Sequence, residues 1–299
     1  MKIIITGGTG LIGSNLCKKL VDRGHDIRVL TRKKNPLFPF NQFIWDPEKL
    51  QINDAVFKDV DSIIHLAGEN IAKKRWSKIR KNQLINSRVE TANFLLNKIT
   101  KLKIPLKHFI SSSAVGYYGA VTTDTIFSEA DTNSIDFLGK LGSNWEAAAD
   151  NFSKIGSQVS IVRTGIVLSS KGGALKEMRK PFNWFLGAPL GSGSQYMPWI
   201  HIEDLSALYT CLLEGDIAPG VYNGVAPEHI TNIEFTHALS DLLKKPLLLP
   251  NVPSWLMHLF FGNMAIILLQ GSRISSDKLM QSSFTFKFPK LKSALNSFL

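Results

Sequence analysis

A glycine-rich loop near the start of the chain has residue types and spacing that suit phosphate binding. Gly7, Gly10 and Gly13 lie between a run of three isoleucines and a segment with helical apolar spacing. The first glycine of such a loop permits a tight turn, the second admits a pyrophosphate, and the third lets helix and strand pack closely. A plain tight turn is the alternative, but the flanking strand and helix favour dinucleotide binding, with helix N–H groups facing the phosphates. The predicted contacts are Gly7, Thr9, Gly10, Leu11, Ile12 and Gly13.

The end of the second expected strand indicates which dinucleotide is bound. Asp26 to Thr31 is typical of a strand, and Arg32, Lys33 and Lys34 follow it without an acidic residue. An acid at this place binds the ribose 2′-hydroxyl of NAD, whereas a basic residue accommodates the 2′-phosphate of NADP. A solvated basic loop is the alternative. We therefore expect NADP rather than NAD, with Arg32 and Lys33 at the 2′-phosphate.

A third strand end adds to this site. Asp61 to His65 reads as a buried strand and ends in the small-residue turn Leu66-Ala67-Gly68. Ligands of open α/β sheets bind at the carboxyl ends of the strands, so we expect this turn to contact the cofactor. The basic run Lys73 to Lys81 leads into a long helix and is either a solvated face or a lid over a phosphate-bearing ligand.

Composition limits the class of protein. The chain has 299 residues, 44% hydrophobic and 20% charged, which is ordinary for a soluble globular protein. Its formal charge of +11 suits anionic ligands, and no recognised nucleic-acid module is present. Two cysteines in separate expected helices and an N-terminus that begins as strand favour a cytoplasmic protein with reduced thiols. We expect a monomer or homodimer that binds a small molecule, without a metal site or a nucleic-acid or membrane partner.

The order of expected elements predicts the fold. Strands and helices alternate from residue 1 to 163, which predicts an α/β Rossmann-type doubly wound parallel sheet. We expect 200–225 to return to this domain, 164–299 to form most of the substrate side, and 247–299 to form a small, mainly helical C-terminal domain. Lys171 to Pro198 reads as a loop-built ligand wall. Ser254 to Gly271 has the length of a membrane span but is interrupted by polar residues, so we expect a buried helix pair.

Several motifs taken together resemble the extended short-chain dehydrogenase/reductase superfamily. Within it, the chain is most similar to NAD-dependent epimerase/dehydratase-like proteins that carry a C-terminal domain of unassigned function. Some of these have been called nucleoside-diphosphate-sugar epimerases or cell-division-inhibitor-like proteins. The motifs are Thr6 to Gly13, His65 to Gly68, Ser111 to Ala114, Arg163 to Gly165, Gly68 to Ala72, Arg75-Trp76, Ser87 to Val89, Ser113 to Gly119, Met197 to His201, and the tail Gly271 to Leu291.

The resemblance implies hydride transfer between NAD(P) and a carbon that bears oxygen. In the superfamily a tyrosine moves the alcohol proton, a lysine four residues later lowers the tyrosine pKa, and a serine binds the substrate oxygen. Ser113 matches the serine, with a serine that satisfies strand-end backbone groups as the alternative. Ser111 and Arg163 are the further cofactor contacts that the resemblance implies. The implied substrate contacts are Glu69, Asn70, Arg75, Arg88, Trp199 and His201.

The chain departs from this pattern at the tyrosine and the lysine. Aligned on Glu146, their positions fall on Leu138 and Gly142, and no Tyr-x-x-x-Lys occurs nearby. Tyr117 or Tyr118 could supply the phenol, with Lys73, Arg75 or Lys140 as the cation, or both tyrosines could form pocket wall. We expect an NADP-dependent epimerase or oxidoreductase acting on a small anionic, nucleotide-sugar-like substrate. The alternative is a catalytically silent NADP-binding sensor or binding module.

Overall fold

A single eight-stranded sheet organises the main part of the chain. The computed structural model describes residues 1–298, and its strand order across the sheet is β11-β8-β6-β5-β1-β2-β3-β4. Every neighbouring pair is parallel except β3 with β4 at one edge. The strands are β1 (Lys2–Thr6), β2 (Asp26–Thr31), β3 (Gln42–Asp46), β4 (Gln51–Ile52), β5 (Ser62–His65), β6 (His108–Ala114), β8 (Gln158–Thr164) and β11 (Val221–Gly224).

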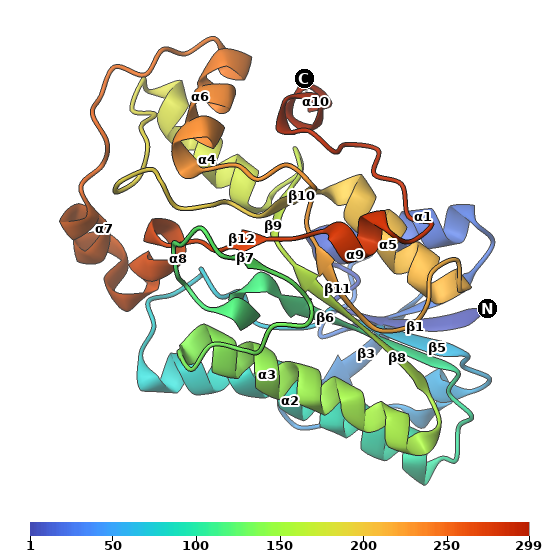
Figure 1. Ribbon diagram of the computed structural model, residues 1–299. Helices are drawn as coiled ribbons and strands as arrows, with labels where there is room; N and C mark the ends of the chain where they lie inside the picture. The colour runs from blue at the N-terminus through green and yellow to red at the C-terminus, as the bar shows by residue number, and fades with distance from the viewer. Residues whose placement is uncertain (299) are drawn as a thin grey trace.

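Helices cover both faces of this sheet, as Figure 1 shows. On one face lie α1 (Leu11–Asp22) and α5 (Ile202–Glu214), and on the other α2 (Lys78–Lys101) and α3 (Phe137–Asp150). Because successive strand side chains point to opposite faces, Ile3 and Ile5 of β1 enter the α1/α5 core while Ile4 enters the other. All three isoleucines are fully buried. The doubly wound α/β fold predicted from the sequence is confirmed.

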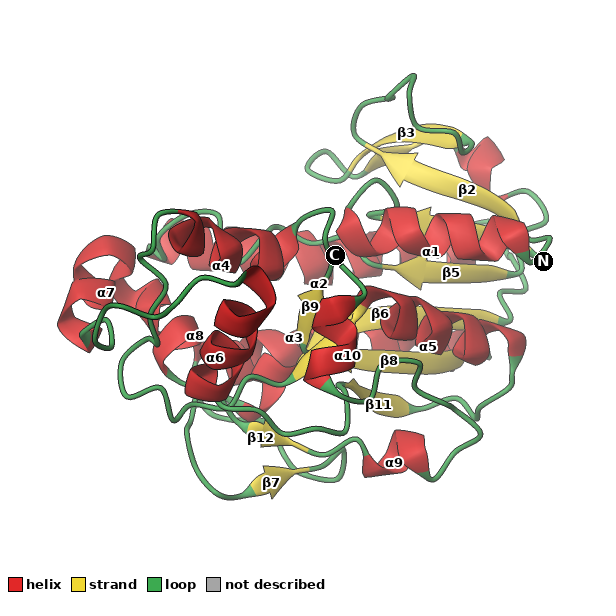
Figure 2. Cartoon of the chain, turned by 90° about the horizontal axis from the view of Figure 1, so that it is seen from above, coloured by secondary structure: helices red, strands yellow, loops and turns green. Residues whose placement is uncertain are grey.

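The C-terminal part forms a smaller, mostly helical lobe beyond the carboxyl ends of the strands (Figure 2). Its core lies between short parallel strands and three helices and is centred on Trp199 and Phe235. The Thr231 and Glu234 side chains form a capping box at the start of one of these helices. The elements are β9 (Ile166–Leu168), α4 (Gly173–Asn183), β10 (Trp199–His201), α6 (Asn232–Leu243) and α10 (Leu291–Asn296).

Two sequence-based expectations about this lobe are wrong. The expected loop wall from Lys171 to Pro198 contains α4, which turns Leu175 and Phe182 into the core. The expected buried pair is α7 (Ser254–Phe261) and α8 (Ile266–Leu269), joined by η4 (Gly262–Ala265). Of these, α7 is largely exposed, with Trp255 at 67%, and α8 is only partly buried. The apolar side chains of this segment that are covered, such as Met264 and Ile266, pack against Trp76 and Leu84 and not into the core of the lobe. Within residues 1–298, no helix is both long and apolar enough to cross a membrane.

Short elements complete the chain. β7 and β12 form a separate parallel pair that joins the loop after β6 to the tail of the chain. α5 packs on the main sheet and β11 pairs with β8, so the chain returns to the sheet after forming β10. The remaining elements are η1 (Asp54–Phe57), η2 (Val115–Tyr118), β7 (Ile126–Phe127), η3 (Asn151–Ile155), β12 (Arg273–Ile274) and α9 (Asp277–Met280).

Candidate functional site

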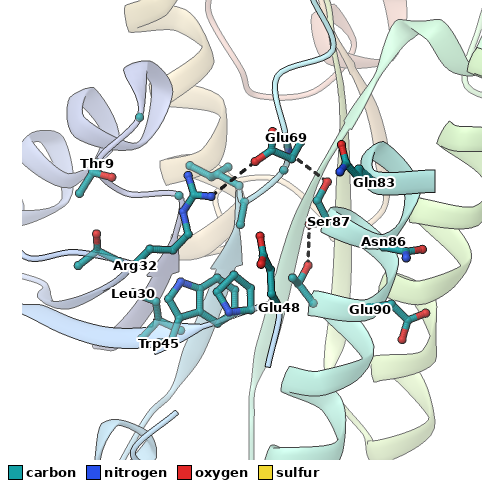
Figure 3. A pocket seen from close by; sticks show the side chains of 18 of the residues that line it. Thr9, Leu30, Arg32, Trp45, Glu48, Glu69, Gln83, Asn86, Ser87 and Glu90 are labelled. Carbon is teal, nitrogen blue, oxygen red and sulfur yellow. Dashed lines mark hydrogen bonds and ion pairs between the residues drawn. The ribbon is translucent and has the colours of Figure 1, made fainter. Parts of the chain in front are cut away.

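A cavity of about 930 Å³ lies at the carboxyl ends of β1, β2 and β5 (Figure 3). The chain order of the strands reverses between β1 and β5, and open α/β sheets bind their ligands at such a point. The cavity is lined by Gly7, Thr9, Gly10, Leu30, Thr31, Arg32, Lys33, Trp45, Pro47, Glu48, Leu50, Leu66, Ala67, Gly68, Glu69, Lys74, Arg80, Gln83, Asn86, Ser87, Glu90 and Thr91.

The glycine loop has the close backbone contacts that a phosphate cradle requires. Gly7 has a positive φ of 68°, and the Gly10 N–H donates to its carbonyl oxygen at 3.0 Å. A Cβ at Gly13 would lie 2.3 Å from the Gly7 carbonyl oxygen and 2.5 Å from the Gly8 Cα, so only glycine lets α1 start here. No side chain caps α1, and its first turn holds no acid. The free N–H groups and the dipole therefore suit the pyrophosphate of a dinucleotide.

A buried hydrogen-bond chain holds two strand ends together beneath the cavity. Thr6 Oγ1 accepts the N–H groups of Leu66 and Ala67, both at 3.1 Å, so its own proton points to His65 Nδ1 at 2.9 Å. The Nε2–H of His65 then donates to Thr91 Oγ1 at 3.2 Å. Burial lowers the pKa of His65 to about 4. A neutral imidazole thus fixes the backbone of the turn that lines the cavity.

Arginines hold the segment that follows this turn. Arg80 Nη1 lies 3.0 Å from Glu69 Oε2, and Arg88 Nη2 donates to the Glu69 carbonyl oxygen at 3.0 Å. Arg32 Nη1, from the end of β2, lies 3.5 Å from Glu69 Oε1. The hydrogen bond from Arg80 is the main cause that lowers the pKa of Glu69. Burial lowers the pKa of Arg88 to about 10, and its guanidinium stacks on Trp145.

The predicted cofactor contacts fall into two groups. Those that line the cavity are Gly7, Thr9, Gly10, Arg32, Lys33, Leu66, Ala67 and Gly68. Leu11 and Ile12 begin α1 beside it, and Gly13 is buried in the contact between loop and helix. Ser111 and Arg163 do not line the cavity: Ser111 is fully buried in β6, and Arg163 is buried at the end of β8.

The candidate catalytic residues Ser113 and Tyr118 belong to a separate buried network. Ser113 Oγ donates to Glu146 Oε1 at 2.7 Å, and Arg163 binds both oxygens of the same carboxylate at 2.8 Å. The Tyr118 hydroxyl accepts from Arg163 Nη1 at 2.8 Å and donates to Asn223 Oδ1 at 2.7 Å. Burial raises the pKa of Tyr118 to about 12. These groups satisfy one another, and this pKa is far too high for an efficient base at neutral pH.

Tyr117 occupies the space beside the two positions where the superfamily tyrosine and lysine would lie. A Cβ at Gly142 would meet the Cα of Tyr117 at 3.1 Å, and Leu138 packs against Gly116. The Arg163 guanidinium lies 3.5 Å from the centre of the Tyr117 ring. Tyr117 is partly exposed, and its hydroxyl makes no hydrogen bond with any residue that the structure describes. The catalytic roles of Ser113, Tyr117 and Tyr118 stay predictions.

Among the predicted substrate contacts, only Glu69 lines the cavity. Asn70 and Arg75 are exposed: Asn70 Oδ1 accepts the Ala72 N–H at 2.8 Å, and Arg75 donates to the carbonyl groups of Leu259 and Phe260 at the end of α7. Arg88 is buried under the turn as described above.

The other two predicted substrate contacts are buried in the C-terminal lobe. Trp199 has no exposed surface, and His201 is 2% exposed. His201 Nδ1 accepts the Glu203 N–H at 3.1 Å and so caps α5. Its ring stacks on Phe298 and lies tilted against Phe288. Burial lowers the pKa of His201 to about 4. Both side chains therefore hold the lobe together in this arrangement.

Sequence reasoning missed one wall of the cavity, which α2 forms. Four polar residues of this helix, all labelled in Figure 3, recur at spacings of three, one and three and line the cavity. This spacing places them on one helix face, so the signal was present in the sequence. The residues are Gln83, Asn86, Ser87 and Glu90. No group of three potential metal ligands occurs within the described residues.

Comparison with known proteins supports the family predicted from the motifs. The family model described as NAD dependent epimerase/dehydratase family matches residues 3–223, and a domain of unknown function (DUF1731) matches 252–298. The epimerase family protein SDR39U1 of Mus musculus is 35% identical over 298 residues, which cover 99% of this chain and 98% of the mouse protein.

Solved structures agree with this comparison. The crystal structure of human SDR39U1 with NADPH has a TM-score of 0.87 and 34% identity, and the match covers 100% of this chain and 99% of the human chain. UDP-glucuronic acid 4-epimerase from Bacillus cereus, solved with UDP-glucuronic acid and NAD, has a TM-score of 0.79 over 99% of this chain and 97% of its own. At 18% identity, that second match shows the fold alone. The chain thus belongs to the NAD dependent epimerase/dehydratase family.

Proposed function

We propose that the chain binds NADP(H) in the cavity, with the pyrophosphate on the glycine loop and the 2′-phosphate beside Arg32 and Lys33. The observation that carries this proposal is the position of these two cations. Both directly follow β2 and line the cavity near Gly10, where an NAD-binding protein would place an acid. The NADPH in the human SDR39U1 structure supports the same choice for this chain.

When bound, NADP(H) supplies a hydride donor or acceptor, and the residues of the chain hold it. The N–H groups at the start of α1 neutralise the phosphates, and Gly13 keeps the helix close enough to do so. Trp45 and Pro47 offer an apolar wall of the cavity for the adenine. The Thr6–His65–Thr91 chain holds the turn of Leu66 to Gly68 in place.

The test is a titration of the protein with NADPH and with NADH, followed by nicotinamide fluorescence. We expect NADPH to bind more tightly, and Arg32→Ala to weaken NADPH by about tenfold while NADH changes little, because one charge-assisted phosphate contact is lost. Lys34→Ala is the control, since Lys34 also follows β2 but does not line the cavity. Equal affinities in the wild type, or NADPH binding unaffected by Arg32→Ala, would contradict the assignment.

For chemistry, we propose an epimerase or oxidoreductase reaction on a small anionic substrate of the nucleotide-sugar kind, bound between the sheet and the C-terminal lobe. The formal charge of +11 and the exposed cations Lys73, Lys74 and Arg75 beside the cavity support an anionic substrate. Tyr117 is the better candidate for the phenol, because its hydroxyl is not engaged whereas that of Tyr118 is. A screen of sugar nucleotides, aldehydes and ketones for NADPH oxidation, repeated with Tyr117→Phe, tests this.

A second candidate function is a catalytically silent NADP(H)-binding sensor. It is favoured by the absence of Tyr-x-x-x-Lys and by the mutual satisfaction of Ser113, Glu146, Arg163 and Tyr118. A protein that binds NADPH but oxidises none of it in the substrate screen would support the sensor. Turnover that is lost in Tyr117→Phe would support the enzyme.

A further inference from the structure

We propose that Glu69 sets the preference of this chain between NADP(H) and NAD(H), because its carboxylate occupies the place beside Arg32 that a 2′-phosphate would take. This inference rests on the proposed binding of NADP(H) and adds a residue that limits its selectivity. Figure 3 shows Arg32 and Glu69 directed toward each other across the cavity.

The carboxylate joins two guanidinium groups that come from different elements. Glu69 Oε1 lies 3.5 Å from Arg32 Nη1, and Oε2 lies 3.0 Å from Arg80 Nη1. The Arg80 side chain is 6% exposed, and its Nε has no hydrogen-bond partner among the described residues. The pair of cations is thus an anion site that the protein fills with a side chain of its own.

The backbone of Glu69 is fixed, but its side chain has room to move. The N–H of Glu69 donates to Ser87 Oγ at 3.0 Å, and its carbonyl oxygen accepts from Arg88. The side chain is one-third exposed to the cavity, and that of Arg32 is 70% exposed. The hydrogen bond from Arg80 lowers the pKa of Glu69, so the carboxylate stays ionised at neutral pH. The carboxylate can turn away from Arg32 without any change in the turn below it.

The two cofactors make opposite demands on this carboxylate. A 2′-phosphate competes with it for Arg32 and is repelled by its charge, whereas a ribose 2′-hydroxyl can donate a hydrogen bond to it. The chain therefore combines the basic residue of NADP-binding proteins after β2 with an acid that reaches the same place from the end of β5. Glu69 weakens NADP(H) binding and strengthens NAD(H) binding relative to what Arg32 alone would give.

The experiment measures the dissociation constants of NADPH and NADH for the full chain and for Glu69→Gln at fixed salt. We expect Glu69→Gln to bind NADPH about tenfold more tightly and NADH no more tightly than the wild type does, since one repulsive charge at short range is removed. Glu90→Gln removes an acid from the same cavity that makes no ion pair with a described residue. The Glu90→Gln control measures the general effect of removing a negative charge from the cavity. We expect its gain in NADPH affinity to be much smaller than that of Glu69→Gln.

Two further variants keep the test decisive. Glu69→Asp retains a negative charge near Arg80 but has a shorter side chain toward Arg32. We therefore expect a smaller gain in NADPH affinity than for Glu69→Gln. This variant replaces Glu69→Gln if Glu69→Gln does not fold. In an Arg32→Ala background, Glu69→Gln should have a smaller effect, because no competition for Arg32 remains and only the direct repulsion is removed. NADPH binding that is unchanged or weaker in folded Glu69→Gln, with wild-type binding intact, overturns this inference alone. A wild type that binds neither cofactor overturns the proposed function as well.

Discussion

The cavity and the network around Glu146 lie at the same end of one sheet, but the polar groups of the cavity are accessible whereas those of the network are buried and bonded to one another. At the cavity, no side chain caps the N–H groups at the start of α1, and the side chains of Arg32 and Lys33 are exposed, although Arg32 also lies near Glu69. At the ends of β6 and β8, Ser113, Glu146 and Arg163 are all at least nine-tenths buried and bond to one another. Groups kept for a ligand stay accessible, whereas buried groups must find partners within the protein. This end of the sheet thus has one region with accessible polar groups and a second region whose polar groups bond to one another.

The largest expected effect on NADPH binding comes from closing the glycine loop. In Gly13→Ala the new Cβ meets backbone atoms of Gly7 and Gly8 that cannot move independently, so we expect a loss of stability of about 3 kcal/mol from overpacking. NADPH binding should become undetectable, because α1 no longer points its N–H groups into the cavity. Fluorescence titration and thermal unfolding measure the two effects. The control is Gly172→Ala, whose Cβ would have its nearest neighbour at 3.7 Å. Normal NADPH binding by Gly13→Ala would show that the loop is not a cradle.

Breaking the buried ion pair tests the other side of the comparison. Glu146→Ala leaves the Arg163 guanidinium, which is 3% exposed, without its carboxylate, and we expect a loss of about 3–5 kcal/mol in the free energy of unfolding. Urea unfolding measures it, with the exposed Glu177–Lys180 pair as the matched control. Glu177→Ala should cost about 0.5 kcal/mol or less. The double variant Glu146→Ala/Arg163→Met should recover part of the loss. A small loss in Glu146→Ala would mean that the network is not structural.

Acid pH should act on the hydrogen-bond chain beneath the cavity. The unfolded histidine titrates near 6.5 and His65 in the folded protein near 4, so the unfolded state binds more protons between these values. Stability therefore falls as the pH drops from about 6.5 to 4, by about 3 kcal/mol for one group shifted this far, and levels off below. Urea unfolding at a series of pH values across this range measures the free energy of unfolding. In His65→Gln this free energy should fall less steeply with decreasing pH than in the wild type. The exposed His237→Gln serves as the control, and a wild-type slope in His65→Gln would rule out this origin.

The smallest effects distinguish the two neighbouring tyrosines. Tyr118→Phe leaves Arg163 Nη1 and Asn223 Oδ1 without the hydroxyl that joins them, which should cost about 1–3 kcal/mol. Tyr117→Phe keeps the ring under Arg163 and should change stability by about 0.5 kcal/mol at most. Thermal unfolding compares them directly. Equal losses would mean that the Tyr117 hydroxyl is also held by the fold.

Sequence reasoning worked well where a pattern acts locally. The strand at Asp26 to Thr31 and the glycine loop between strand and helix depend on residues a few positions apart, and the structure has both elements as predicted. The resemblance implied Trp199 and His201 as substrate contacts; Trp199 lies in the core of the C-terminal lobe and His201 is buried, and their contact with a substrate stays a prediction. An aromatic residue and a histidine suit a binding site and a packed core equally well, so their types alone could not decide.

The sequence by itself determined the doubly wound sheet, the cradle at Gly7 to Gly13 and the basic end of β2, because periodicity and spacing specify each of them. Only the tertiary structure decided which charges meet. Glu69 lies 37 positions after Arg32 along the chain, and Arg163 lies 17 after Glu146, and no local rule pairs them. The sheet places the ends of β2 and β5 on either side of β1, and α3 packs against β8, so whether a charge faces a ligand or a partner depends on how sheet and helices assemble.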